Sequence, residues 1–228
     1  MKIEFCVTSI EGAVAAEQFK ADRIELCSRL DLDGLTPSLN LIQQCRSEYK
    51  GEIHIMIRPE DGPFICSDNT LRKMQNSILK SAEIGINGIV IGILNDHNQI
   101  NTKATASLVE MAKRYHLETT FHRAFDHLTD PISSLKNLYD LGINRILCSG
   151  SNTNVEKGIQ SLKKLKTMAQ NTVEIMAGGG VNQYNAPSLQ QIGLDAIHFS
   201  IHNIKNNTPV YNEVNEEKIK SILHALEF

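Results

Sequence analysis

Short apolar runs recur along the chain and alternate with longer amphipathic stretches. Four runs share one pattern: a residue that ends a helix is followed by an apolar residue, then Asn or Asp, and then a β-rich segment. These runs lie at residues 20–26, 85–91, 142–147 and 193–199. A Gly that opens this pattern takes the left-handed conformation that ends a helix, and the polar residue turns the chain into a strand. Further runs at residues 3–7, 53–57, 118–121 and 172–176 bring the predicted strands to eight.

The spacing of these strands predicts the fold. They begin near residues 3, 23, 53, 88, 118, 145, 172 and 196, and helical periodicity fills the gaps, as at 71–84, 104–115, 132–141 and 155–168. Eight βα units without a linker indicate an α/β protein with a single (β/α)8 barrel domain over residues 1–228. An open doubly wound sheet needs fewer strands and a Gly-rich first turn, which residues 8–12 lack. Residues 58–69 and 202–215 are predicted to be irregular.

Alternation along the strands predicts an unusually polar barrel interior. Barrel interiors are mostly filled by Val, Ile and Leu, whereas here many polar side chains face the axis. The inward set includes Glu4, Cys6, Arg23, Glu25, Cys27, His54, Met56, Arg58, Thr120, His122, Arg145, Ser149, Glu174, Met176, His198 and Ser200. Buried charges are costly unless they pair, so these groups form a salt-bridge layer or contact a ligand. Both interpretations stay open for Arg23, Glu25, Arg145 and Glu174.

Residues that follow the strands are the candidates for chemistry, because this fold builds its active sites there. After the fifth strand, His122 is a candidate acid or base, Asp126 could orient it, and Arg123 could clamp an anion. Arg58 stands before Pro59, which forces an extended exit from the third strand and aims the guanidinium. The alternative is structural, with Asp126 capping the next segment and Arg123 pairing with it.

A glycine-rich turn follows the seventh strand and predicts a phosphate site. Barrels commonly bind phosphate between the loops after strands seven and eight, through backbone N–H groups that glycine leaves open. The candidate residues are Ser149, Gly178, Gly179, Gly180 and Ser200. The alternative is that three glycines make only a tight turn.

Two cysteines form a candidate metal site. Cys6 and Cys27 fall at matching ends of neighbouring strands, and parallel strands lie about 4.8 Å apart. Paired thiolates suit a soft ion, and Cu(I) with Met56 nearby is the natural choice. The alternative is that each cysteine is a small buried apolar residue.

Composition and charge exclude several classes of protein. The chain carries 23 Lys and Arg against 26 Asp and Glu, a net charge of -3, and no Trp. A basic surface and stacking aromatic residues are therefore lacking, which argues against nucleic acid as a partner. No apolar run is long enough to span a membrane, and no secretory signal precedes the first strand. Five cysteines without a CxxC pair indicate reduced thiols and a cytoplasmic location.

Seven short motifs along the chain together resemble those of the CutC family of copper homeostasis proteins. They lie at residues 4–7, 21–27, 34–38, 56–59, 120–126, 145–150 and 178–181. The resemblance implies a (β/α)8 barrel, a cytoplasmic location and a role in copper tolerance and trafficking. It also implies that Cys6 and Cys27 match the positions proposed to hold Cu(I). The chain departs from the family pattern at Glu60, where a second Arg is usual.

Two functions therefore remain open. The leading hypothesis is a cytoplasmic copper homeostasis protein that binds Cu(I) through Cys6 and Cys27. The alternative is a barrel enzyme acting on a small phosphorylated or carboxylated substrate. In that enzyme His122 is the acid or base, Arg58 and Arg123 are clamps, and Glu25 is a second carboxylate. A homo-oligomer is compatible with the sequence, although no segment predicts its contact.

Overall fold

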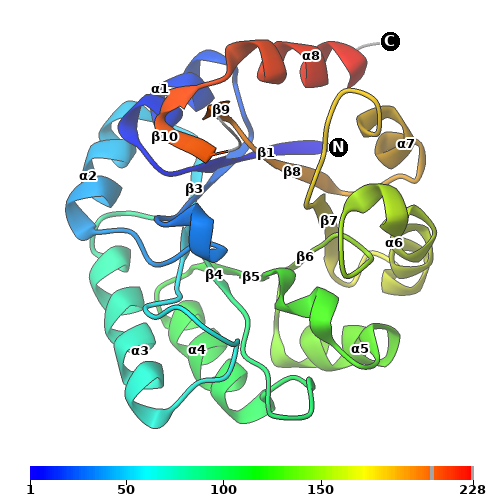
Figure 1. The fold of residues 1–228 in the computed structure, drawn as a ribbon. Helices are drawn as coiled ribbons and strands as arrows, with labels where there is room; N and C mark the ends of the chain where they lie inside the picture. The colour runs from blue at the N-terminus through cyan, green and yellow to red at the C-terminus, as the bar shows by residue number, and fades with distance from the viewer. Residues whose placement is uncertain (206–207, 227–228) are drawn as a thin grey trace.

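Eight parallel strands close into a barrel with helices around it in the computed structural model (Figure 1). The structure describes residues 1–205 and 208–226. Strands follow one another around the ring in chain order, and β8 pairs with β1 to close it. The predicted (β/α)8 barrel is confirmed.

The barrel strands are β1 (Lys2–Val7), β2 (Arg23–Leu26), β3 (Glu52–Met56), β4 (Gly88–Ile91), β5 (Glu118–Phe121), β6 (Arg145–Cys148), β7 (Glu174–Gly178) and β8 (Ala196–Ser200). The helices are α1 (Ile10–Gln18), α2 (Leu39–Glu48), α3 (Asp68–Ala82), α4 (Thr102–Arg114), α5 (Pro131–Leu141), α6 (Val155–Ala169), α7 (Ala186–Gln191) and α8 (Glu216–Leu226). Two short 3-10 turns, η1 (Leu30–Leu32) and η2 (Arg123–His127), follow β2 and β5. In the described residues, no helix combines the length and hydrophobicity needed to cross a bilayer.

Local signals explain where the helices begin and end. The side chains of Ser67, Asp130 and Asn154 accept hydrogen bonds from the first turns of α3, α5 and α6. Gly142 ends α5 with a φ of 92°, as the repeated pattern predicts. β7 starts two residues later than expected, because Thr172 still bonds the Ala169 carbonyl at the end of α6.

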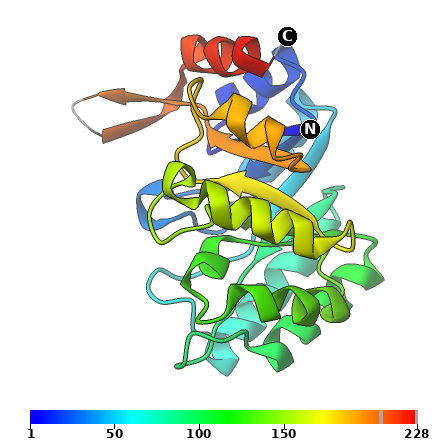
Figure 2. The same ribbon diagram turned by 90° about the vertical axis from the view of Figure 1, so that its right-hand side faces the viewer.

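The prediction of an irregular segment at 202–215 is wrong. Its described residues include β9 (His202–Lys205) and β10 (Thr208–Val214), which pair antiparallel. Figure 2 shows the hairpin projecting from the barrel beyond the end of β8. Period-two alternation of apolar residues did not reveal this hairpin, which the backbone pairing of β9 with β10 identifies.

Two kinds of packing fill the two faces of the strands. Outward apolar side chains such as Phe5, Ile24 and Ile146 are fully buried against the helices. Inside the barrel, Arg23 bonds Glu4 and Glu52, and Arg145 bonds Glu118, Glu174 and Thr120. The structural interpretation therefore holds for Arg23, Arg145 and Glu174. It fails for Glu25, which lies outside this layer.

Candidate functional site

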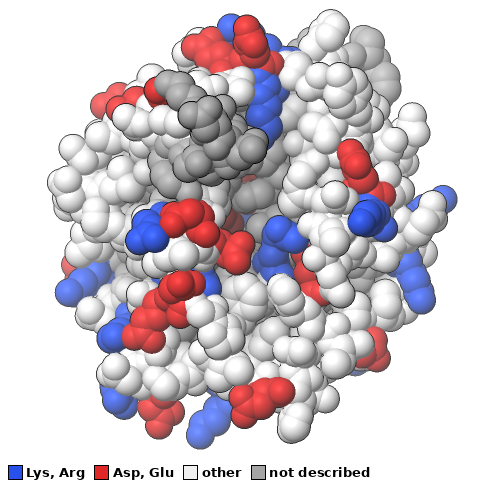
Figure 3. Space-filling model, in the orientation of Figure 1, with Lys and Arg blue, Asp and Glu red and all other residues white. Residues whose placement is uncertain are grey.

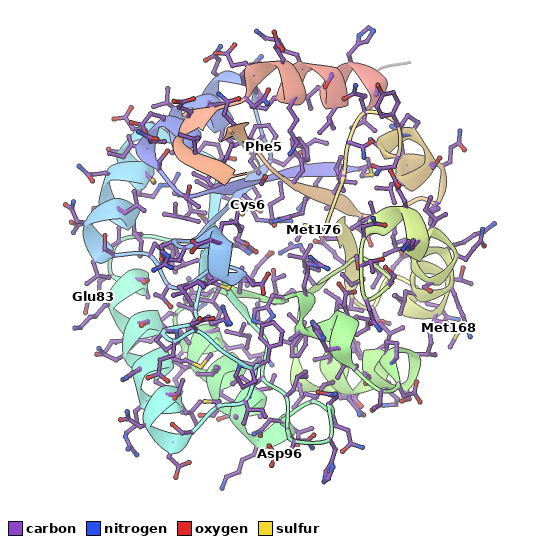
Figure 4. The ribbon with its side chains drawn as sticks, in the orientation of Figure 1. Phe5, Cys6, Glu83, Asp96, Met168 and Met176 are labelled. Carbon is purple, nitrogen blue, oxygen red and sulfur yellow. The ribbon has the colours of Figure 1, made fainter. Side chains whose placement is uncertain are left out.

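A cavity of about 350 Å³ opens at the carboxyl ends of the barrel strands, and we call it the mouth cavity. Its ionisable lining comprises Cys6, Glu25, Asp33, His122, Arg123, His127, His198 and Lys218. Below it, toward the amino ends, a buried cluster of Leu147, Met176 and Ala196 fills the barrel. Figure 4 shows Cys6 and Met176 inside the ring of strands, whereas Glu83, Asp96 and Met168 lie at the outer rim. The cavity therefore stands where this fold carries out its chemistry.

The two candidate metal ligands meet at the bottom of this cavity. The register pairs Cys6 with Glu25, so Cys27, directly after β2 and two residues beyond Glu25, lies on the same face. The two sulfur atoms lie 3.8 Å apart, and both side chains are buried. Met56 packs with them in one apolar cluster. The structure thus brings Cys6, Cys27 and Met56 together.

Beside the thiols lies a chain of buried acid and imidazole groups. Glu4 Oε1 is 2.7 Å from His198 Nδ1, and the other Glu4 oxygen accepts from Arg23. Glu25 Oε1 lies 4.0 Å from the Cys6 sulfur. The nearest ligand atoms of Glu4, Glu25 and His198 all lie within 4.8 Å of one another.

Burial and these contacts shift the pKa values of the cluster. Burial raises the pKa of Glu25 to about 7, against the opposing charge of His198. Burial lowers the pKa of His198, but the Glu25 carboxylate and the Cys6 and Glu4 contacts outweigh it and raise that pKa well above its usual value. The hydrogen bond with Cys27, followed by burial, raises the pKa of the Cys6 thiol. Cys6 is therefore protonated at neutral pH before any metal binds.

Arg123 and Asp126 are coupled to each other rather than to His122. Arg123 Nε donates to Asp126 at 3.0 Å, while Asp126 accepts from the backbone and hydroxyl of Ser149 at 2.9–3.0 Å. His122 Nδ1 instead accepts from the Ala124 amide at 3.1 Å. The prediction that Asp126 orients His122 is wrong, because its oxygens are used by Arg123 and the Ser149 loop.

His122 and Arg58 face a second, smaller cavity of about 90 Å³, although His122 also lines the mouth cavity. The Arg58 guanidinium donates to the carbonyls of Leu32, Gly34 and Gly62 at 2.6–3.1 Å. Burial and the charge of Arg58 lower the pKa of His122 to about 3, which leaves its imidazole neutral. Arg58 therefore fastens loops beside the mouth cavity instead of lining it.

The predicted phosphate residues divide into two groups. Gly179, Gly180 and Ser200 line the mouth cavity. Gly178 stays within β7, and the Ser149 hydroxyl donates to Asp126 and to the Ser151 carbonyl. The structure thus brings Gly179, Gly180 and Ser200 together at the cavity, and their role in binding phosphate stays a prediction.

Three residues of the site escape the sequence interpretation. Alternation turns Glu4 and His198 toward the axis, but it does not show that they bond each other across the β1–β8 closure. Lys218 comes from α8 and reaches the cavity to donate to the Ser200 carbonyl at 2.6 Å. No local signal predicts that contact, because it depends on how α8 docks.

The chain resembles known proteins over most of its length. The model of the CutC family matches residues 1–203. The family protein CutC of Glaesserella parasuis is 40% identical over 201 residues, which cover 88% of this chain and 82% of the relative. The human copper homeostasis protein cutC homolog is 35% identical over 206 residues, covering 90% and 75%. The crystal structure of a CutC protein from Streptococcus agalactiae superposes with a TM-score of 0.81 at 33% identity, covering 87% of this chain and 97% of that one.

Proposed function

The chain belongs to the CutC family, and on that basis we propose that it acts in copper homeostasis in the cytoplasm by binding Cu(I) through Cys6 and Cys27. The observation that carries the proposal is the buried pair of sulfur atoms, 3.8 Å apart, at the mouth of the barrel. The human relative is described as a copper homeostasis protein, which agrees with this assignment.

The donor chemistry of the pair fits Cu(I). Thiolate and thioether sulfurs favour soft ions, and Met56 lies in the same cluster as the two cysteines. The nearest ligand atoms of Cys6, Glu25 and Cys27 lie within 4.8 Å of one another, so a single ion could contact both sulfurs.

Two further groups of residues with metal-ligating atoms fit a cation less well. They are Glu4 with Glu25 and His198, and Glu52 with His54 and Glu118. In both, carboxylates already pair with arginine, at Arg23 in the first and at Arg23 and Arg145 in the second. Because the guanidinium charge repels a metal ion, the thiol pair is the better site.

An anaerobic Cu(I) titration against a chromophoric chelator tests the proposal. The protein should take up about one ion per chain and release protons as it does so, because thiolates are the ligands and Cys6 starts protonated. The double variant Cys6→Ser/Cys27→Ser should lose this uptake.

Two controls keep the result interpretable. Cys66→Ser removes a partly exposed thiol that does not line the mouth cavity and should leave uptake unchanged. Cys6→Ala/Cys27→Ala keeps the site apolar, so matched circular dichroism spectra would show that lost uptake does not come from unfolding. Full uptake by a folded double variant would refute the thiol site.

A further inference from the structure

The mouth cavity holds polar groups that a thiol-bound ion does not use. Glu25 is only 3% exposed and lines the cavity. Its Oε2 atom is buried and has no hydrogen-bond partner in the described part of the chain. Leaving such an atom unpaired is energetically costly, so native sites usually satisfy it with a ligand or water.

Arg123 presents unused donors to the same cavity. Its Nε is fixed by Asp126, whose carboxylate is 2% exposed and also accepts from the amides of Ser149 and Gly150. The two terminal nitrogens of Arg123 meet no hydrogen-bond acceptor within residues 1–205 and 208–226. The guanidinium is therefore oriented by one edge, while its other edge is free for an anion.

The loop after β7 is shaped around this guanidinium. Gly179 has a φ of 98°, and a Cβ atom there would lie 3.0 Å from Arg123 Cζ. The backbone N–H groups of Gly179 and Gly180 donate to no acceptor that the structure describes. Glycine thus allows the guanidinium and two unpaired amides to lie together, as a phosphate cradle requires.

Lys218 adds a second cation on the neighbouring wall. Its ammonium is half-buried, lines the cavity and donates to the Ser200 carbonyl. Among the residues described, no carboxylate lies within salt-bridge distance of it. An ammonium held by one neutral carbonyl keeps donors for an anionic ligand.

Glu25 and the Arg123 guanidinium lie on opposite walls of the cavity. Glu25 and Asp33 come from β2 and the loop after it, whereas Arg123 is anchored to the loop after β6. Lys218, bonded to the end of β8, lies between these two walls. In a closed ring of eight strands, β2 stands across from β6. Figure 3, which views this face, shows acidic and basic side chains on facing sides of a central hollow.

From this arrangement we propose that the mouth cavity binds a small phosphate ester with a free hydroxyl group. The phosphate lies against Arg123, Lys218 and the amides of Gly179 and Gly180, and the hydroxyl bonds Glu25. A hydroxyl suits this position, because it both donates and accepts and so satisfies Glu25 in either protonation state. The volume of about 350 Å³ is typical of sites for small molecules.

Calorimetric titration of the metal-free protein tests the assignment with glycerol 3-phosphate, inorganic phosphate, glycerate and glycerol. Glycerol 3-phosphate should bind more tightly than inorganic phosphate or glycerate, and glycerol should not bind. Arg123→Gln should weaken both phosphate probes about tenfold or more, since a charge-assisted bidentate contact is lost. Glu25→Gln should weaken only the ester.

Matched variants separate this site from the copper proposal. Arg72→Gln removes an exposed arginine on α3 and should change nothing. Cys27→Ser removes one proposed copper ligand that does not line the cavity and should retain ester binding, so the two proposals can fail independently. The phosphate ester is refuted if neither phosphate probe binds, if glycerate binds equally well, or if Arg123→Gln binds like the parent protein.

Discussion

Replacing Glu4 by Gln should destabilise the barrel strongly, because it removes one charge from a buried ion pair. The side chains of Glu4 and Arg23 are 1% and 0% exposed. Gln keeps the size of the side chain but leaves the Arg23 charge with Glu52, whose carboxylate is 41% exposed and 3.2 Å away. The His198 imidazole loses its anionic partner as well.

The magnitude follows from the burial of the two partners. Breaking a buried pair by removing one charge costs about 3–5 kcal/mol, and the remaining Glu52 contact favours the lower end. Domains unfold with about 5–15 kcal/mol, so this loss is a large share of the total. In a chain of 228 residues it corresponds to a fall in Tm of roughly 6–20 °C. Glu52→Gln, in the same network but near solvent, should cost only about 0–1 kcal/mol.

Urea unfolding followed by circular dichroism measures these losses at neutral pH. A double-mutant cycle with Arg23→Met isolates the pair, because removal of both charges should cost less than the sum of the single losses. A buried, coupled Glu4–Arg23 pair is refuted if Glu4→Gln costs no more than Glu52→Gln, or if the losses at Glu4 and Arg23 simply add.

Two further stability predictions concern His122 and Gly158. Since burial and Arg58 lower the pKa of His122 from 6.5 to about 3, the unfolded chain binds the proton first as the pH falls. The stability that this residue contributes is therefore fully present above pH 6.5. Between pH 7 and pH 5 the wild type should lose about 2 kcal/mol more unfolding free energy than His122→Gln, as measured by urea titrations. Equal losses in the two proteins would contradict this. Gly158→Ala should cost about 1–3 kcal/mol of unfolding free energy, because the added Cβ would overlap the Ser149 carbonyl. In a helix position with free space, the same replacement of Gly by Ala would instead stabilise the protein by about 1 kcal/mol. A raised Tm in calorimetry would count against that packing argument.

Local patterns predicted the barrel because strands and helix ends depend on neighbouring residues. Alternation correctly turned Cys6 and Glu25 toward the axis, and the position of Gly142 marked the end of α5. The same alternation does not give the height of a residue in the barrel. Register does, and it separates Glu25, paired with Cys6, from Arg23, paired with Glu4. The sequence therefore left Glu25 undecided between the salt-bridge layer and the cavity.

Contacts between distant segments account for what the sequence did not predict at the site. Pro59 led to the expectation that the Arg58 guanidinium points toward the active end of the barrel. Three loop carbonyls instead bind that guanidinium outside the mouth cavity. Lys218 reaches the cavity only because α8 docks beside β8. Such contacts depend on how loops and helices pack around the barrel, and spacing along the chain does not encode them.

X-ray absorption at the copper edge of the Cu(I)-loaded protein tests the thiol site most directly. Two buried sulfurs predict a first shell made of sulfur, and that shell should disappear in Cys6→Ser/Cys27→Ser but persist in Cys66→Ser. A first shell of nitrogen and oxygen atoms in the wild type would contradict the assignment of Cys6 and Cys27 as the ligands.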